Sequence, residues 1–276
     1  MKTIPQVLNR DMTKSKFRRK KILRRTRIAG WTALSGLITT ALGFLTFLHI
    51  VLPADREFTV EVFKDPRVDF STETEHLTLA PTQAANSTGI LLLPTSRVHE
   101  YGYLYHFSEL VAEGYTLVVV QPPLNHPIFE NRTFSELTQG YPEIQRWVLA
   151  GHGAGGLKAC RLANQALSTH LLLLDSYCDI DISRLKIEVL QIIASEDSQV
   201  PFDEEERNQS YLPENSSIPI QLADIGYFSF GAFELPAAES QGLLSPEEAR
   251  KKLSGLIQEW LQSAEPPTPT LSKISF

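Results

Sequence analysis

The sequence has 276 residues, of which 42% are hydrophobic and 21% are charged, and its net charge is −6. This length has room for one large domain and an appendage, and the composition is ordinary for a folded globular protein. The charge is divided unevenly, because residues 1–27 carry eleven Lys and Arg against one Asp, whereas the rest carries fifteen against thirty-one Asp and Glu. A basic tail with an acidic body argues against nucleic acid as a partner of the body.

An apolar stretch follows the basic tail at once. Residues 28–52 run for 25 positions without a charged side chain. A helix of this length, rising about 1.5 Å per residue, reaches roughly 37 Å and can cross a hydrocarbon core of about 30 Å. The alternatives are a buried core helix, which seldom stays apolar on every face for so long, and a cleavable signal peptide. A signal peptide has a shorter apolar region of about 7–15 residues.

We therefore predict an uncleaved single-pass anchor in contact with membrane lipid. The basic flank predicts a cytoplasmic N-terminus, so the remaining chain is expected outside the cytoplasm, at the cell membrane. The same flank is suited to contact anionic lipid head groups. The expected segments are a basic cytoplasmic segment at residues 1–27, the anchor at 28–52, a globular domain at 53–263 and a disordered tail at 264–276.

The body alternates strand patterns with helix patterns. Residues 58–63 and 75–79 alternate apolar and polar side chains, which predicts strands of a half-solvated sheet. Further strands are expected at residues 89–93, 115–121, 147–150, 171–175, 189–194 and 218–222. Helices are expected at residues 100–112, 157–167, 203–211 and 246–261, with residues 134–145 partly helical. Strands alternating with helices predict an α/β fold, a mostly parallel sheet with helices on both faces.

A glycine-rich turn lies at the centre of the body. The apolar run 147–150 is followed by Gly151-His152-Gly153-Ala154-Gly155-Gly156 and then by the expected helix. A strand, a sharp glycine turn and a helix are the setting of the nucleophile elbow, Gly-x-Ser-x-Gly, of α/β-hydrolases. Glycine stands at position 153, where the elbow has serine. The scaffold of a catalytic site is therefore expected without its nucleophile.

Four further segments surround this turn in a fixed order. Residues 89–98, 121–129, 194–201 and 226–231 read GILLLPTSRV, QPPLNHPIF, ASEDSQVP and GYFSFG. In this order they resemble the oxyanion loop, the loop after the next strand, the acid loop and the histidine loop of the α/β-hydrolase superfamily. The likeness is to a group of small dienelactone-hydrolase-like bacterial proteins that often carry a membrane anchor. It covers roughly residues 55–262 and implies an α/β-hydrolase fold.

The resemblance also implies which positions form the site. Gly153 takes the place of the nucleophile, Asp197 that of the acid, and Tyr227 that of the histidine. Glycine has no side chain to attack with, and tyrosine, with an ordinary pKa near 10, is a poor base at neutral pH. We therefore expect a degenerate and inactive triad. The pocket and oxyanion loop implied by the resemblance contain Thr95, Ser96, Ala154, Asn125, His126 and His152.

The same glycines allow a second interpretation. Gly151, Gly153 and Gly156 fit the dinucleotide fingerprint Gly-x-Gly-x-x-Gly, and Asp175 follows 19 residues after the last of them. An acid at that distance suits a ribose hydroxyl. A dinucleotide fingerprint normally lies on the first strand of its domain, whereas other strands precede this one. The interpretation also leaves the segments 121–129 and 194–201 unexplained.

A third interpretation keeps an enzyme with a relocated nucleophile. Ser176 follows a strand end, and Ser96 lies in the oxyanion loop. Either hydroxyl would need a base, and His126 and His152 are the histidines near the expected pocket mouth. This arrangement would make the chain a residual ester or acyl hydrolase.

The sequence thus favours a membrane-anchored pseudo-hydrolase. We expect it to bind a small apolar or ester-like ligand, or a protein partner at the membrane, without a cofactor and without a metal. The two cysteines, Cys160 and Cys178, are placed on a helix and beyond a strand end. An offset of order 10 Å between these places predicts no disulfide.

Overall fold

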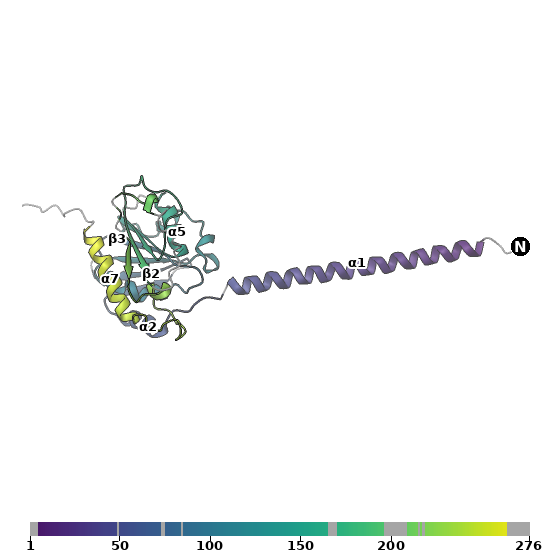
Figure 1. Cartoon of the computed structure of the whole chain (residues 1–276), viewed down its shortest axis with the longest axis horizontal. Coiled ribbons are helices and arrows are strands. Elements are labelled where there is room, and N and C mark those ends of the chain that lie inside the picture. The colour runs from purple at the N-terminus through teal and green to yellow at the C-terminus, as the bar shows by residue number, and fades with distance from the viewer. Residues whose placement is uncertain are drawn as a thin grey trace, which may run out of the picture. The chain divides into compact units, whose positions relative to one another are not determined.

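The computed structural model describes residues 5–48, 50–72, 75–83, 85–164, 170–195, 209–214, 216 and 219–263, with the backbone alone for residues 5–23 and 48. The chain divides into two units, Met1–Ile50 and Val51–Phe276 (Figure 1). The first unit contains a single long helix, α1 (Pro5–Leu48). The second unit, the body, contains a sheet with helices on both of its faces.

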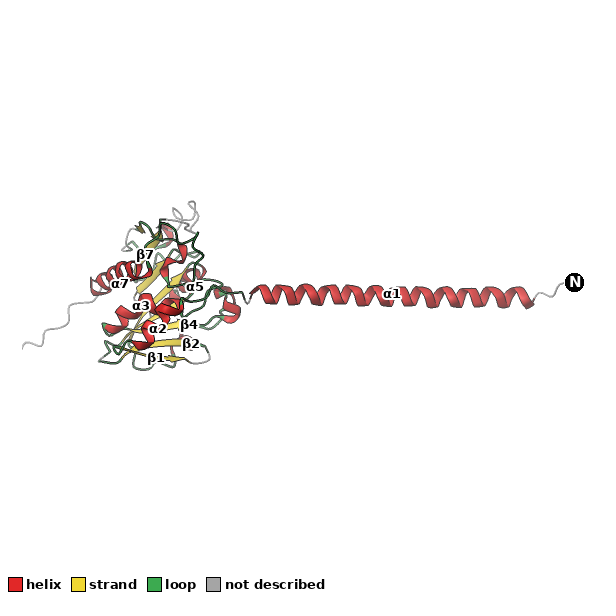
Figure 2. Ribbon diagram, turned by 90° about the horizontal axis from the view of Figure 1, so that it is seen from below, coloured by secondary structure: helices red, strands yellow, loops and turns green. Residues whose placement is uncertain are grey.

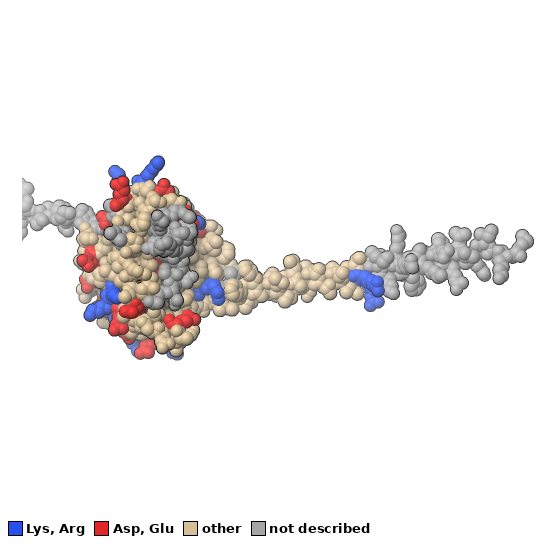
Figure 3. All heavy atoms as spheres, viewed as in Figure 1, with Lys and Arg blue, Asp and Glu red and all other residues tan. Residues whose placement is uncertain are grey.

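The helix α1 contains the apolar stretch expected from the sequence. Its segment Arg24–Phe47 has a mean hydropathy of 1.5, and none of it is buried. Figure 3 shows this stretch as a charge-free surface that follows a cluster of cations. The helix is long and apolar enough to cross a membrane, and a signal sequence has the same properties. Because the segment is exposed, it is not a core helix.

Eight strands form one mixed sheet in the order β1-β2-β4-β3-β5-β6-β7-β8. The first two strands pair antiparallel with their neighbours, and the pairs from β4 to β8 are parallel. Parallel central strands are buried on both faces, which explains their continuous apolar sequences. The strands are β1 (Val68–Thr72), β2 (His76–Pro81), β3 (Thr88–Leu93), β4 (Thr116–Val120), β5 (Arg146–His152), β6 (His170–Leu174), β7 (Glu188–Ala194) and β8 (Ile220–Leu222).

Helices cover both faces of this sheet. The first face carries α2 (Arg56–Lys64), α3 (Gly102–Ala112) and α7 (Pro246–Ser263), and the opposite face carries α4 (Phe134–Thr138) and α5 (Ala154–Ala163) (Figure 2). Alternate side chains of each strand enter opposite cores. On β3, for example, Ile90 and Leu92 pack toward the first face and Leu91 and Leu93 toward the second. The predicted α/β fold with a mostly parallel sheet is therefore confirmed.

The predicted strand at residues 58–63 is wrong, because this segment is the helix α2. Asp55 caps the helix by accepting a hydrogen bond from the Glu57 N–H at 2.8 Å. Phe58 and Val62, four residues apart, face the core, whereas Val60 between them is exposed. Apolar residues at alternate positions also fit one side of a short helix, and the capping aspartate was the signal that decided between the two.

The expected absence of a disulfide is also wrong. Cys160 and Cys178 are joined, with their Cα atoms 5.6 Å apart. The chain does not continue away from the end of β6, but turns back along α5. The Ser176 hydroxyl donates to the Gly153 carbonyl at 2.7 Å, and Arg161 on α5 pairs with Asp179 beyond the cysteine. The segment after β6 thus descends beside α5 and brings the two cysteines to the same level.

Two of the predicted segments lie outside the described residues. They are the tail at 264–276 and most of the helix expected at 203–211. The acid loop at 194–201 is described only as far as Ser195, so Asp197 also lies outside. The helix expected from residue 157 begins earlier, at Ala154, directly after the glycine turn.

Candidate functional site

The turn between β5 and α5 has the geometry of a nucleophile elbow. Gly153 lies at φ 49° and ψ −118°, a backbone conformation that side chains beyond glycine adopt only at a cost. Its N–H donates to the Leu174 carbonyl at 3.0 Å, and its carbonyl accepts from the Gly156 N–H at 3.0 Å. The turn is therefore fixed to β6 and to the first turn of α5.

The space in front of Gly153 is occupied by Tyr227 and Thr95. A Cβ atom added to Gly153 would overlap the Tyr227 hydroxyl and would lie 2.7 Å from Thr95 Oγ1. The two hydroxyls are hydrogen-bonded to each other. Tyr227 comes from the 3-10 turn η3 (Tyr227–Phe230), and Thr95 comes from the loop after β3. The place where a serine side chain would stand is therefore filled by protein atoms.

Tyr227 cannot act as a base at neutral pH. Burial raises its pKa to about 12, with the charge of Asp175 adding to this effect and the Thr95 hydrogen bond opposing it. A phenol with this pKa keeps its proton, so it can donate a hydrogen bond but cannot accept a proton from an alcohol.

His152 lies beneath the elbow and is fully buried, at 0% exposure. Its Nδ1 lies 2.8 Å from the Tyr103 hydroxyl, which in turn accepts from the Thr95 N–H at 3.0 Å. The imidazole packs against the Tyr227 ring, with centroids 4.6 Å apart, and the Phe230 ring, at 5.3 Å. Burial lowers the pKa of His152 to about 3, so the ring is neutral.

This chain of contacts changes the oxyanion loop. In an active elbow, backbone N–H groups of the loop after β3 and of the residue after the nucleophile bind the oxyanion. Here the Thr95 N–H is already bound to Tyr103. Ala154, the residue after Gly153, opens α5 and is half-buried, as is Ser96. One of the two expected groups of donors is therefore engaged within the protein.

Comparison with known proteins agrees with this geometry. The sequence profile described as the alpha/beta hydrolase family matches residues 89–251, more than half of the chain. The chain belongs to the alpha/beta hydrolase family. No curated protein matches it.

Solved structures with a similar chain path include TT1662 from Thermus thermophilus, at 16% identity and a TM-score of 0.46, covering 71% of this chain and 99% of that one. Another is a predicted CIB-like hydrolase from Thermoplasma acidophilum, at 14% identity and a TM-score of 0.45, covering 69% of this chain and 97% of that one.

The segment after β6 supports the elbow of this family member. Asp175 is 1% exposed at φ 40°, and its Oδ1 accepts from the Ala194 N–H of β7 at 3.0 Å. Its charge reaches Tyr227, so the carboxylate lies near the occupied nucleophile position. Asp175 thus joins two strands and does not offer its carboxylate to a ribose. This use, together with the family assignment, weighs against the dinucleotide interpretation.

Asn125 and His126 belong to a neighbouring loop. Asn125 ends the turn η1 (Pro123–Asn125) at φ 57°, and its carbonyl accepts from the Arg97 N–H at 2.8 Å. His126 packs edge-on against Phe129, with ring centroids 6.0 Å apart. Burial lowers the pKa of His126, and the charge of Arg97 adds to this. These two residues tie the loops after β3 and β4 together, and their bonds described above are not to Gly153 or Tyr227.

Sequence reasoning missed two residues of α3. Tyr103 links Thr95 to His152, and His106, one turn further along, is buried away from the elbow. A tyrosine and a histidine in a helix of otherwise apolar residues are the available signal, because a buried polar group is normally hydrogen-bonded. The sequence alone does not say to which partner.

Proposed function

We propose that this chain is a membrane-anchored, non-catalytic member of the alpha/beta hydrolase family. It acts by binding, either of a small ligand or of a protein partner at the membrane. One observation carries the proposal: the Tyr227 hydroxyl and Thr95 occupy the space of the missing nucleophile side chain at Gly153. A substrate carbonyl would need this space in order to be attacked.

Each part of acyl-transfer chemistry is affected. Gly153 supplies no nucleophile, and Tyr227, with its raised pKa, supplies no base. The Thr95 N–H already has a partner, and loss of one oxyanion donor alone costs about 10²–10³-fold in rate. These changes act on different steps, so a single compensating residue would not restore ordinary catalysis.

A relocated nucleophile has weaker support. Ser176 is 1% exposed, and its hydroxyl donates to the Gly153 carbonyl, so it serves to hold the elbow. His152, which would be its base, is neutral and directs Nδ1 at Tyr103. Ser96 remains the candidate on the loop after β3, and the experiment below includes it.

Anchoring in the membrane is supported by α1 and by the cysteines. The apolar segment Arg24–Phe47 has the length of a membrane span, and the cations before it favour a cytoplasmic N-terminus. The disulfide between Cys160 and Cys178 is the kind of bond that persists in an oxidising compartment. Both features favour a body outside the cytoplasm, with lipid contacts made by residues 28–52 and the basic flank.

The test is labelling by a serine-directed fluorophosphonate probe, applied to the full-length protein in its membrane. We expect no labelling, while an active serine hydrolase added to the same membranes is labelled. Labelling that disappears in Ser96→Ala or Ser176→Ala would overturn the proposal and establish a residual hydrolase with a relocated nucleophile.

A further inference from the structure

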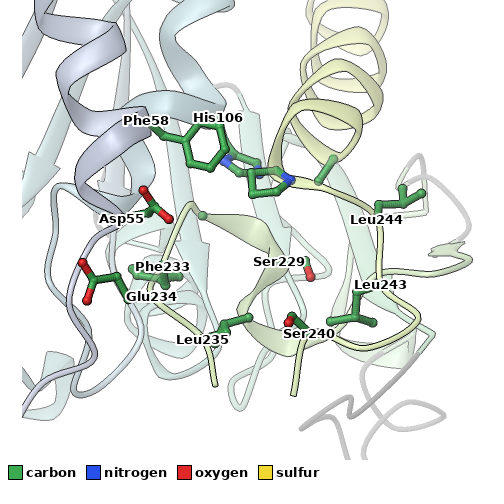
Figure 4. Close-up of a pocket in the computed structure, with 13 residues that line it drawn as sticks. Asp55, Phe58, His106, Ser229, Phe233, Glu234, Leu235, Ser240, Leu243 and Leu244 are labelled. Atoms are coloured by element: carbon green, nitrogen blue, oxygen red, sulfur yellow. The ribbon is translucent and has the colours of Figure 1, made fainter. Parts of the chain in front are cut away.

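A cavity of about 410 Å³ lies on the face of the sheet covered by α2, α3 and α7, apart from the elbow. Its walls come from these three helices and from the segment that follows η3. Neither Gly153, Thr95 nor Tyr227 lines it. Figure 4 shows Phe58 and His106 on one side of the cavity and Leu235, Ser240 and Leu243 opposite them.

His106 is the polar group buried in this wall. The side chain is 2% exposed, and neither ring nitrogen has a hydrogen-bond partner among the residues that the structure describes. Burial of an imidazole without a partner is unfavourable, so such a group in a cavity wall calls for an explanation. Burial also lowers the pKa of His106 to about 3, and the charge of Arg250 adds to this. The neutral ring offers one N–H donor and one acceptor.

The other walls define the rest of a ligand. Phe58, Phe233, Leu235 and Leu243 supply apolar surface, which suits a hydrocarbon or aromatic skeleton. At about 30 Å³ for each water-sized group, the cavity holds a skeleton of roughly a dozen heavy atoms.

The charges around the cavity select against anions. Asp55 and Glu234 line one side, and both carboxylates are drawn there in Figure 4. The nearby cation, Arg250, pairs with Glu61 at 3.5 Å and Glu109 at 3.6 Å and does not line the cavity. A carboxylate or phosphate entering the cavity would therefore meet two like charges without a compensating cation in the wall.

We infer that this cavity binds an uncharged amphiphile, an apolar skeleton of roughly a dozen heavy atoms that carries one hydroxyl or amide group facing His106. A hydroxyl or an amide can both donate to and accept from the neutral imidazole, which satisfies both ring nitrogens. The inference rests on the proposed function, since it gives a binding protein its ligand site. It moves that site from the filled pocket at Gly153 to the opposite side of η3.

The test compares three probes with a common skeleton: 4-phenylbutan-1-ol, butylbenzene and 4-phenylbutanoate. Binding to the full-length protein in lipid nanodiscs is measured by isothermal titration calorimetry, with empty nanodiscs as the background for partition into lipid. We expect the alcohol to bind more tightly than the hydrocarbon, and the carboxylate to bind most weakly.

Variants of the wall assign the binding to this cavity. His106→Phe removes both ring nitrogens at similar size, and it should weaken alcohol binding about tenfold while leaving butylbenzene unchanged. Asp55→Asn with Glu234→Gln keeps a capping side chain on α2 and should strengthen carboxylate binding. Ser240→Trp, at an exposed position of the wall, should abolish binding of all three probes. Ser135→Trp, exposed on α4 across the sheet, is the matched control and should change nothing.

Failure of all three probes to bind, or alcohol binding that is equal in wild type and Ser240→Trp, would overturn the inference and leave a cavity that holds water. Alcohol binding unchanged in His106→Phe would overturn the role of the imidazole. These outcomes do not depend on fluorophosphonate labelling, so failure of the ligand site and failure of the non-catalytic proposal are distinguishable.

Discussion

Gly153 and Tyr227 depend on each other at the scale of single residues. Replacement of Gly153 by alanine should strain a left-handed backbone and force the Cβ atom onto the Tyr227 hydroxyl. We expect Gly153→Ala to lower the free energy of unfolding by more than the roughly 1–3 kcal/mol of backbone strain alone. Gly242→Ala is the control, because Gly242 has φ 83° but no atom within 4 Å of an added Cβ.

Urea unfolding followed by tryptophan fluorescence would measure both losses. In a Tyr227→Phe background, which lacks the overlapping hydroxyl, Gly153→Ala should cost less than in the wild type. Equal costs at Gly153 and Gly242, with no coupling to Tyr227→Phe, would show that the hydroxyl does not occupy the nucleophile position.

Two buried histidines predict a pH dependence of stability. Burial lowers the pKa values of His106 and His152 to about 3 in the folded protein, from an ordinary 6.5. The unfolded chain therefore binds protons below pH 6.5 that the folded chain does not bind until about pH 3. The free energy of unfolding should be complete above pH 6.5 and should fall as the pH drops toward 3, by at most about 1.4 kcal/mol per pH unit for each histidine.

Urea unfolding at pH values between 4.5 and 7.5 would show this slope. The variant His106→Phe removes one titrating group, so its slope should be shallower in this window. A slope identical to that of the wild type would mean that His106 is not buried in its neutral form.

At the scale of elements, burial patterns predicted what the core decides. The apolar runs at residues 89–93 and 171–175 correspond to strands of the central sheet, because a parallel strand covered on both faces has no polar positions. The pattern failed at α2, where three apolar residues at alternate positions fit a short helix equally well. It also missed β1, an edge strand in which Val68 alone is buried.

The disulfide is the element-scale feature that strand and helix patterns could not predict, since it depends on where the segment after β6 turns. It closes a loop with a sequence separation of 18 residues. A loop of this size predicts a stabilisation of about 3 kcal/mol, through restriction of the unfolded chain. Cys160→Ser with Cys178→Ser should lose about this amount. Addition of a reductant to the wild type should give the same loss, and no loss from either treatment would contradict a formed bond.

At the scale of the whole molecule, the resemblance predicted which loops meet, and physics of the single sequence did not. The loop after β3 and the turn η3 are more than a hundred residues apart, yet Thr95 and Tyr227 share a hydrogen bond. The place of Tyr227 followed from the histidine loop of the family. The contacts of Tyr103 with Thr95 and His152 follow from packing, which no short motif records.

The orientation of the body in the membrane can be tested through its cysteines. In spheroplasts, protease added from outside should digest the body and leave a small N-terminal fragment. A maleimide reagent should label Cys160 and Cys178 only after reduction, because an exported body holds them as a disulfide. A chain lacking residues 28–52 is the control and should carry free thiols in the cytoplasm. A protected body with free thiols in the full-length chain would contradict the predicted orientation.

The central claim is that the nucleophile position is filled and the chain does not catalyse ester hydrolysis. The most direct measurement is hydrolysis of p-nitrophenyl acetate by the full-length protein and by a triple variant with Gly153→Ser, Tyr227→His and Thr95→Ala. The triple variant supplies a hydroxyl and an imidazole and clears the two side chains that an added Cβ would meet. We predict the buffer rate for the wild type and for each single variant, and measurable turnover for the triple variant alone, because triad members act as a unit. Wild-type turnover above the buffer rate that is lost in Ser96→Ala would contradict the claim.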